Sequence, residues 1–293
     1  MKVKKIKMKK YLEGKDPSFE DDLFEGLRET GFVILEDHGI SNDLLNKVYD
    51  TSKNYFSKEK VEKDNDISEV YKFQRGYIPY KTEHAKDSNL MDLKEFYQVG
   101  IDRNNYPSKE FKEVVEDLYS QLEKNAKIML KALTKNLKLE EDYFDKMTDK
   151  GDSILRLLHY PPIGNNEDPN AIRAAEHEDI NLITLLVAAE GKGLQILTRE
   201  GDWIDVETKK GEIVVDVGDM LSRITNNLLP STTHRVVNGD QKENSRYSMP
   251  FFCHPNPEAI LSVIDHLKDG NEEQDIKAND FLNQRLREIG LKK

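Results

Sequence analysis

The sequence predicts a mixed α and β protein with a double-stranded β-helix (jelly-roll) core, an N-terminal helical layer and a C-terminal helix. Three observations predict this fold. From residue 153 onward, short apolar segments recur between Gly and Asp turns, which is typical of a double-sheet β fold. Ahead of them, apolar residues recur at helical spacing over residues 20–58 and 109–149. Behind them, residues 274–290 carry one apolar helical face.

This division predicts two regions in a chain of 293 residues, which is long enough to bury a sizeable core. We expect residues 1–150 to form a layer of helices and strands packed on the core. Residues 151–293 are expected to form the jelly-roll core and the C-terminal helix. Within the first region, the charged stretch 58–70 is predicted to be a mobile connection. Residues 71–104 have few periodic apolar positions and are predicted to be an irregular, functional loop.

Local signals place the elements in more detail. Residues 31–35 predict a strand between two helices, and Ser41 or Asn42 can cap the second of these helices. His38 beside Gly39 is interpreted as a turn residue rather than a metal ligand. The second region is expected to contain short strands rich in Val, Ile and Leu, which cover residues 154–160, 180–187, 193–197, 203–206, 212–217 and 249–253.

Composition narrows the class of protein. Charged residues make up 34% of the chain, and the net charge of −11 argues against nucleic acid, because phosphate contacts need a basic face. Cys253 is the only cysteine, so no intrachain disulfide can form, and its apolar strand predicts a buried, inert thiol. We find no secretory signal and no apolar run of membrane length. We therefore expect a cytoplasmic protein that binds neither nucleic acid nor membranes, and no particular oligomeric state is indicated.

The most informative motif is His177-Glu178-Asp179, followed at a distance by His234. Successive side chains of a strand point to opposite faces, so His177 and Asp179 would share a face and Glu178 would point away. Two histidines and one carboxylate are the ligand set that holds non-haem iron(II) and leaves positions open for dioxygen and a cosubstrate. We interpret His177, Asp179 and His234 as metal ligands and catalytic residues.

A second motif, Arg246 and Ser248, lies beyond His234 at i and i+2, so these two side chains would also share a strand face. A guanidinium beside a hydroxyl is a good receptor for a carboxylate. Alone, each motif has a simpler explanation, because His-x-Asp pairs arise by chance and Arg246 could be a surface salt-bridge partner. The ordered series within β-type sequence favours the metal site.

Together these motifs resemble those of the iron(II)- and 2-oxoglutarate-dependent oxygenases of the isopenicillin N synthase-like family, over nearly the whole chain. The matching segments lie at residues 31–40, 75–77, 92–96, 177–186, 193–195, 218–220, 233–236 and 246–252. The resemblance implies that Fe(2+) is bound by His177, Asp179 and His234. It implies an oxidoreductase that couples decarboxylation of 2-oxoglutarate by dioxygen to hydroxylation, desaturation or cyclisation of a small substrate.

The resemblance also implies how the cosubstrate is bound. Arg246 and Ser248 would hold the distal carboxylate of 2-oxoglutarate, and Tyr160 would lie beside it as a hydroxyl donor. Isopenicillin N synthase and the aminocyclopropane carboxylate oxidases share such motifs and use no 2-oxoglutarate, so a 2-oxoglutarate-independent iron oxidase is one alternative. A non-catalytic metal-binding module is another. The primary substrate is not predicted, and the candidates for lining its cavity or pairing with it are Arg75, Tyr77, His84, Lys86, Arg223, Arg235 and His254.

Overall fold

The fold is described from a computed structural model of the 293-residue chain, which describes residues 2–68, 74–84, 90–164, 167–168, 171–187, 193–238 and 243–288. The helices are α1 (Met8–Leu12), α2 (Phe19–Thr30), α3 (Asn42–Phe56), α4 (Lys60–Asp64), α5 (Lys109–Thr134), α6 (Tyr143–Thr148), α7 (Asp219–Ile224), α8 (Ala278–Glu288) and the 3-10 helix η1 (Asp265–Leu267). The strands are β1 (Lys4–Lys7), β2 (Phe32–Glu36), β3 (Gly76–Ile78), β4 (Glu95–Gly100), β5 (Ile154–Tyr160), β6 (Ala174–His177), β7 (Ile183–Val187), β8 (Leu194–Leu197), β9 (Trp203–Asp205), β10 (Ile213–Val217), β11 (His234–Val236), β12 (Arg246–Cys253), β13 (Ile260–Leu261) and β14 (Ile276–Lys277).

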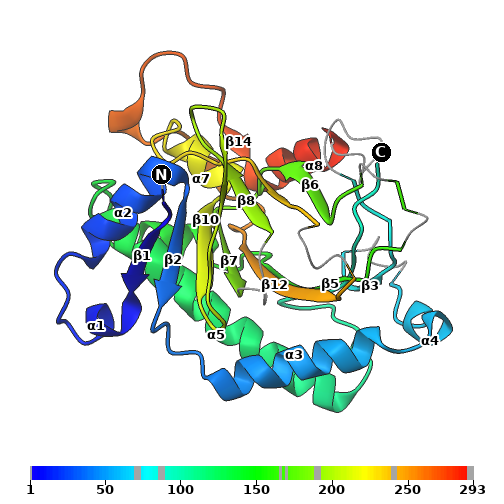
Figure 1. Ribbon diagram of the computed structural model, residues 1–293. Coiled ribbons are helices and arrows are strands. Elements are labelled where there is room, and N and C mark those ends of the chain that lie inside the picture. Colours follow the sequence, from blue (N-terminus) through cyan, green and yellow to red (C-terminus); the bar gives the residue numbers. More distant parts are fainter. Residues whose placement is uncertain are drawn as a thin grey trace.

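Two facing sheets form the jelly-roll core (Figure 1). The large sheet has the strand order β1-β2-β10-β7-β12-β5-β4-β3, and the small sheet has the order β6-β11-β8-β9. Apolar side chains of both sheets meet between them, including Phe32 and Leu158 from the large sheet and Ile196 and Val236 from the small one. The mixed α and β fold with a jelly-roll core is therefore confirmed.

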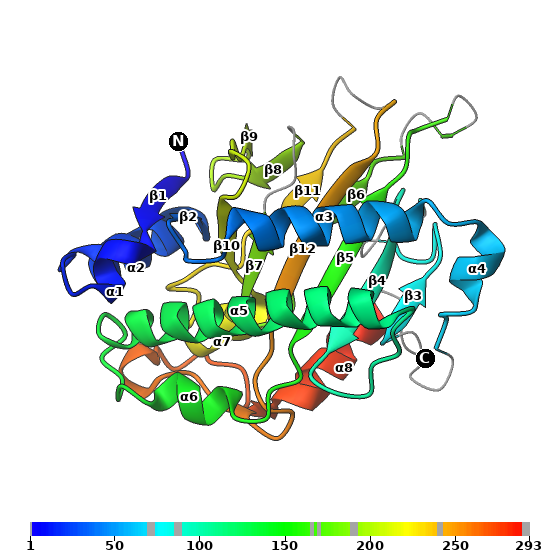
Figure 2. The same ribbon diagram turned by 90° about the horizontal axis from the view of Figure 1, so that it is seen from below.

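Helices cover the other face of the large sheet. Figure 2 shows α3 and α5 lying across the strands on this side. Side chains alternate along each strand, so Leu155 and Leu157 of β5 pack in the core beneath the helices, whereas Leu158 and Tyr160 face the small sheet. Burying one face under helices leaves the opposite face to line a space between the sheets.

The first region contains more regular structure than the sequence predicted. The charged stretch 58–70 holds helix α4, and the supposed irregular loop 71–104 contributes β3 and β4 to one edge of the large sheet. Both predictions are wrong over these elements. The two strands were missed because β3 has only three residues and β4 is buried throughout, so neither shows an alternating pattern. The helix predicted over 109–149 is interrupted after α5, where Lys138 adopts a left-handed φ of 51°.

Several smaller predictions are confirmed. Ser41 caps α3, because its side-chain oxygen accepts a hydrogen bond of 3.1 Å from the amide of Leu44. His38 stabilises its turn through a 2.6 Å hydrogen bond to the Gly211 carbonyl. Cys253 is buried on β12, and burial raises the pKa of its thiol to about 12. Within the described ranges of the chain, no helix is long and apolar enough to span a membrane.

Candidate metal-binding site

Two of the predicted ligands are placed by strand pairing. His177 ends β6 and His234 begins β11, and the two residues lie directly opposite each other in the antiparallel register of the small sheet. Their ring centroids are 4.3 Å apart at an interplanar angle of 51°. Sheet geometry thus brings together two imidazoles that are far apart in the sequence.

Asp179 joins these rings from a loop rather than from a strand. Strand β6 ends at His177, so strand alternation does not extend to Asp179, contrary to the sequence argument. The loop is instead held by backbone contacts, because the amide of Asp219 donates to the Asp179 carbonyl at 2.7 Å. Gly218 allows this close approach, since a Cβ there would lie 2.2 Å from the carbonyl oxygen of Asn181.

The three side chains form a compact ligand set. One potential ligand atom from each of His177, Asp179 and His234 lies within 4.8 Å of the others. The Nε2 of His234 is 3.8 Å from Oδ1 of Asp179. Glu178 takes no part in this cluster; it is exposed and accepts a hydrogen bond from the hydroxyl of Thr233.

Hydrogen bonds fix which nitrogen each histidine presents. Nδ1 of His177 lies 2.6 Å from the carbonyl oxygen of Ala175, and Nδ1 of His234 lies 3.1 Å from that of Thr232. An Nδ1–H that donates to a carbonyl leaves the Nε2 lone pair free for a metal. Burial, together with neighbouring His234, lowers the pKa of His177 to about 4, so this ring is neutral at pH 7.

Three buried residues that sequence reasoning missed form a polar cluster around Asp179. Thr184 of β7 donates a hydrogen bond from its hydroxyl to Oδ2 of Asp179, and Asn181 donates to Thr184 at 2.9 Å. Asp216 of β10 lies opposite Thr184 in the register, and burial beside Asp179 raises its pKa well above the usual range. The polar residues Thr184 and Asp216 interrupt the apolar strands, and this is the sequence signal that could have identified them.

A cavity between the two sheets, here called the inner chamber, opens onto this ligand set. It is lined by Phe32, Lys94, Arg156, Leu158, Tyr160, Ala174, His177, Asp179, Thr184, Leu186, Leu194, Asp216, His234, Val236, Arg246, Ser248, Pro250 and Phe252. Arg246 and Ser248 point to the same face of β12, and Arg246 pairs with Tyr160 of β5 in the register. All three are buried. The structure therefore brings all six predicted site residues to one chamber.

A second cavity, here called the outer chamber, adjoins the first. It is lined by Gln74, Glu83, His84, Asp92, Lys94, Ile154, Arg156, Glu176, His177, Glu178, Asp179, Ile180, Asn181, Asp219, Phe252, His254, Leu282, Arg285, Leu286 and Glu288. Five residues line both cavities and form what we call the shared wall: Lys94, Arg156, His177, Asp179 and Phe252. The C-terminal helix α8 supplies the far side of the outer chamber through Leu282, Arg285 and Leu286.

Arg156 of the shared wall is held by both polar and aromatic contacts. Its guanidinium carbon lies 4.3 Å from the ring centroid of Phe96 and 5.4 Å from that of Phe252. Both terminal nitrogens contact the carboxylate of Glu83, at 3.1 and 3.2 Å, and Nε donates to Gln98 at 2.8 Å. These contacts hold the cation against two aromatic rings.

The predicted substrate-lining residues fall into different places. His84 and His254 line the outer chamber, whereas Lys86 lies outside the described residues. Arg75 is buried elsewhere, in an ion pair of 2.7 Å with Asp152. The remaining three lie outside the linings of both chambers: Tyr77 donates to Glu95, Arg223 pairs with Glu273, and Arg235 stacks on Trp203.

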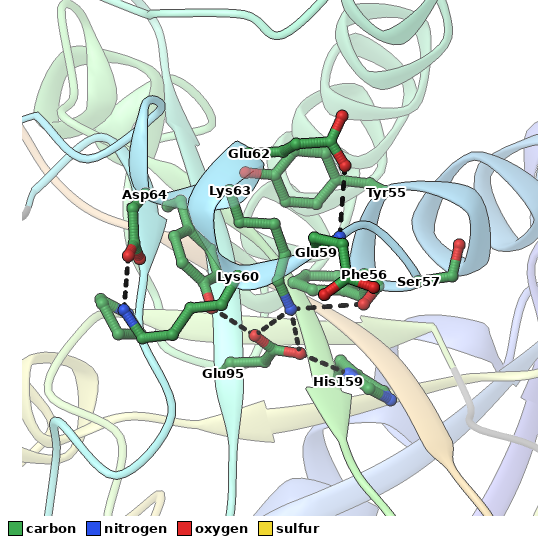
Figure 3. A network of polar contacts seen from close by, with 12 residues as sticks. Tyr55, Phe56, Ser57, Glu59, Lys60, Glu62, Lys63, Asp64, Glu95 and His159 are labelled. Atoms are coloured by element: carbon green, nitrogen blue, oxygen red, sulfur yellow. Dashed lines mark hydrogen bonds and ion pairs between the residues drawn. The ribbon is translucent and has the colours of Figure 1, made fainter.

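The opposite face of the same strands carries a separate polar network, shown in Figure 3. Lys63 of α4 contacts both carboxylate oxygens of Glu95, at 3.0 and 2.8 Å, and Glu95 contacts Nδ1 of His159 at 2.7 Å. His159 precedes Tyr160 in β5, so it faces away from the inner chamber. This buried network ties α4 to the sheet from outside the site.

Comparison with known proteins gives a consistent family. Residues 151–255 match the model of the 2OG-Fe(II) oxygenase superfamily, and residues 3–119 match that of the non-haem dioxygenase in morphine synthesis N-terminal region. The 2-oxoglutarate-Fe(II) type oxidoreductase hxnY of Emericella nidulans is 31% identical over 278 residues, which cover 86% of this chain and 79% of that protein.

Solved structures are similar over almost the full length. A protein of Caulobacter crescentus assigned to the 2OG-Fe(II) oxygenase family has a TM-score of 0.87 and 35% identity, with 98% of this chain and 99% of that chain covered. A full-length Neurospora crassa protein, solved in complex with alpha-KG (2-oxoglutarate) and thymine, has a TM-score of 0.87 and 28% identity, with 97% of this chain and 96% of that chain covered.

Proposed function

Because this chain belongs to the 2OG-Fe(II) oxygenase superfamily, we propose that His177, Asp179 and His234 are its iron(II) ligands. The family resemblance predicted from the sequence is confirmed. The protein is a non-haem iron(II) dioxygenase that couples oxidative decarboxylation of 2-oxoglutarate to oxidation of a small organic substrate. The observation that supports the ligand assignment is the compact cluster of two imidazoles and one carboxylate, all within 4.8 Å.

The chemistry of this donor set fits iron(II). Two neutral imidazoles and a carboxylate on one side of a metal leave the remaining positions open, which is the arrangement of non-haem iron oxygenases. The backbone carbonyls of Ala175 and Thr232 orient the two rings, and Thr184 orients the carboxylate of Asp179. Such outer contacts typically strengthen metal binding by about 10–100-fold.

We assign 2-oxoglutarate to the inner chamber, with its distal carboxylate at Arg246 and Ser248 and with Tyr160 beside it. A buried carboxylate needs a cation and hydrogen-bond donors to offset its desolvation, and these residues supply both. When bound, iron and 2-oxoglutarate together supply the oxidising power for attack on a C–H bond. The chain's own residues bind the cosubstrate, hold it in place and exclude water between the two sheets.

The small-molecule substrate is assigned to the outer chamber, which meets the inner chamber at the shared wall. Phe252 and Arg156 would then position the substrate close to the metal. The net charge of −11 supports the proposal that neither nucleic acid nor an anionic membrane is a partner, and a cytoplasmic location stays a prediction. We retain the proposed division into residues 1–150 and 151–293, although β1 to β4 pair into the same sheet as later strands.

Reconstitution with iron(II) tests this proposal directly. The iron-loaded protein should convert 2-oxoglutarate to succinate and carbon dioxide slowly in the presence of dioxygen, and removal of either iron or dioxygen should stop the conversion. Asp179→Ala should abolish it, whereas Glu178→Ala should retain it, because Glu178 lies outside the ligand cluster. Equal activity of wild type and Asp179→Ala would contradict the ligand assignment.

A further inference from the structure

Lys94 occupies a special position between the two chambers. It is one of the five residues of the shared wall, together with the proposed ligands His177 and Asp179. Its side chain is 12% exposed, and it lines both cavities. The proposed function gives the ammonium group of Lys94 no role in binding either 2-oxoglutarate or the substrate.

The strand register aligns Lys94 with the predicted cosubstrate residues. Glu95 of β4 pairs with His159 of β5, so Lys94, one residue earlier, stands level with Tyr160. Tyr160 in turn pairs with Arg246 of β12. Lys94, immediately before β4, therefore lies in one row with Tyr160 of β5 and Arg246 of β12, and all three line the inner chamber.

Within the described part of the chain, the ammonium group of Lys94 has one more N–H donor than it has carboxylate partners. Nζ of Lys94 lies 2.8 Å from Oδ2 of Asp92 and 3.3 Å from Oε2 of Glu83. A lysine has three N–H donors, so these two carboxylates leave one donor. Arg156, the other cation of the shared wall, is already held by Glu83 and by two aromatic rings.

Lys94 also keeps its charge. Burial alone would lower the pKa of Lys94, but the carboxylates of Glu83 and Asp92 raise it above the ordinary lysine value. The inner chamber must accept a dianion, 2-oxoglutarate, beside the carboxylate of Asp179. Iron(II) and Arg246 match these three negative charges in number, but each buried carboxylate also needs hydrogen-bond donors in place of water, and Lys94 offers one at the shared wall.

We propose that Lys94 is a second cationic binding residue for 2-oxoglutarate, donating a hydrogen bond to one of its carboxylates alongside Arg246. The inference rests on the proposed function of the inner chamber. A purely structural role is the competing explanation, because Asp92, the partner of Lys94, also accepts a 3.0 Å hydrogen bond from the amide of Ala175 in β6. A structural role would change the free energy of unfolding without changing cosubstrate affinity.

The test compares two lysine-to-methionine variants of the full chain. Lys94→Met keeps much of the side-chain volume and removes the charge. Lys63→Met makes the same change at another buried lysine, which pairs with Glu95 on the opposite side of the large sheet (Figure 3). Calorimetry under anaerobic conditions would measure the 2-oxoglutarate Kd of each Mn(II)-loaded protein, since Mn(II) accepts similar ligands.

We expect Lys94→Met to weaken 2-oxoglutarate binding about tenfold or more, as for loss of a hydrogen bond to a charged group. Lys63→Met should bind like wild type. If Lys94→Met does not fold, Lys94→Gln keeps a donor without the charge and should weaken binding by a smaller factor. Wild-type affinity in the folded Lys94 variant would overturn the proposal.

Two analogues identify the carboxylate and separate this inference from the proposed function. Pyruvate carries only the metal-end carboxylate and the keto group, whereas glutarate carries both carboxylates and no keto group. Weaker binding of glutarate alone in Lys94→Met assigns the contact to the distal carboxylate, and weaker binding of both analogues assigns it to the metal-end carboxylate. Unchanged binding of both analogues overturns the proposal. If wild type binds no 2-oxoglutarate, the proposed function fails; if only Arg246→Ala weakens binding, the Lys94 inference alone fails.

Discussion

His177 and His234 face each other across the paired strands β6 and β11, with ring centroids 4.3 Å apart. Each ring also donates from Nδ1 to the backbone carbonyl two residues earlier in the chain, that of Ala175 and that of Thr232. Two of the three proposed ligands are thus set by backbone pairing. The third, Asp179, depends on a loop and on the side chain of Thr184.

Removal of any proposed ligand should abolish iron binding. We expect His177→Ala, Asp179→Ala and His234→Ala each to lose stoichiometric iron and succinate formation, because two remaining ligands cannot retain the metal. Metal content after gel filtration and succinate production measure this effect. Glu178→Ala is the control, and turnover retained in any ligand variant would exclude that residue as a ligand.

Loss of the predicted carboxylate receptor should weaken cosubstrate binding. Arg246→Ala is expected to raise the 2-oxoglutarate Kd by about 10–100-fold, through loss of a charge-assisted hydrogen bond of about 1.5–3 kcal/mol. Arg235→Ala is a matched control, because Arg235 stacks on Trp203 and lines neither chamber. An unchanged Kd in Arg246→Ala would show that the distal carboxylate of 2-oxoglutarate does not bind at Arg246.

The contact from Thr184 should contribute to metal affinity. Thr184→Val keeps the shape of the side chain but removes the hydroxyl that donates to Asp179, so we expect iron affinity to fall by about tenfold or more. Competition with a chelator of known affinity measures the change. Thr134→Val, at a buried threonine that donates to the Lys131 carbonyl in α5, should leave iron affinity unchanged. An equal loss in both variants would indicate a general effect on stability.

Acid should destabilise the metal-free protein partly through His254. Burial lowers the pKa of His254 to about 4, below the ordinary value of 6.5. Between pH 6.5 and 4 the unfolded chain therefore binds a proton that the folded chain does not, and the free energy of unfolding falls as pH falls. We expect His254→Gln to reduce this fall by about 1–3 kcal/mol between about pH 7 and 4.5, measured by urea unfolding.

A control histidine completes this comparison. His266 lies on the exposed helix η1, so His266→Gln should leave the fall in unfolding free energy as it is in wild type. An identical pH dependence in wild type and His254→Gln would show that His254 is not held neutral in the folded protein.

The sequence predicted the parts of the site that consist of spaced polar residues within apolar strands. His177, Asp179, His234, Arg246 and Ser248 were proposed from their spacing and ligand chemistry, and all five line the inner chamber. Other features depend on long-range pairing that no local pattern shows. Thr184 and Asp216 interrupt apolar strands, but only the pairing of β7 with β10 sets them opposite each other beside Asp179. Lys94 reaches the chambers only once the large sheet has formed. Strands β3 and β4 were missed because one has only three residues and the other is buried throughout, so neither shows an alternating pattern.

The carboxylate of Asp179 lies beside the two histidines for a different reason from the one that the sequence suggested. Strand alternation predicted that His177 and Asp179 share a face, yet β6 ends before Glu178. Backbone contacts from Asp219, made possible by Gly218, orient the loop instead. The placement of the carboxylate therefore depends on a tertiary contact between two distant turns.

The most direct test of the central claim is an anaerobic titration of the iron(II)-loaded protein with 2-oxoglutarate, followed by visible absorption. Chelation of iron(II) by the keto and carboxylate oxygens should give a saturable metal-to-ligand charge-transfer band with one equivalent bound per chain. His234→Ala should give no band. Absence of the band in wild type with iron demonstrably bound would contradict the account of the inner chamber as the cosubstrate site.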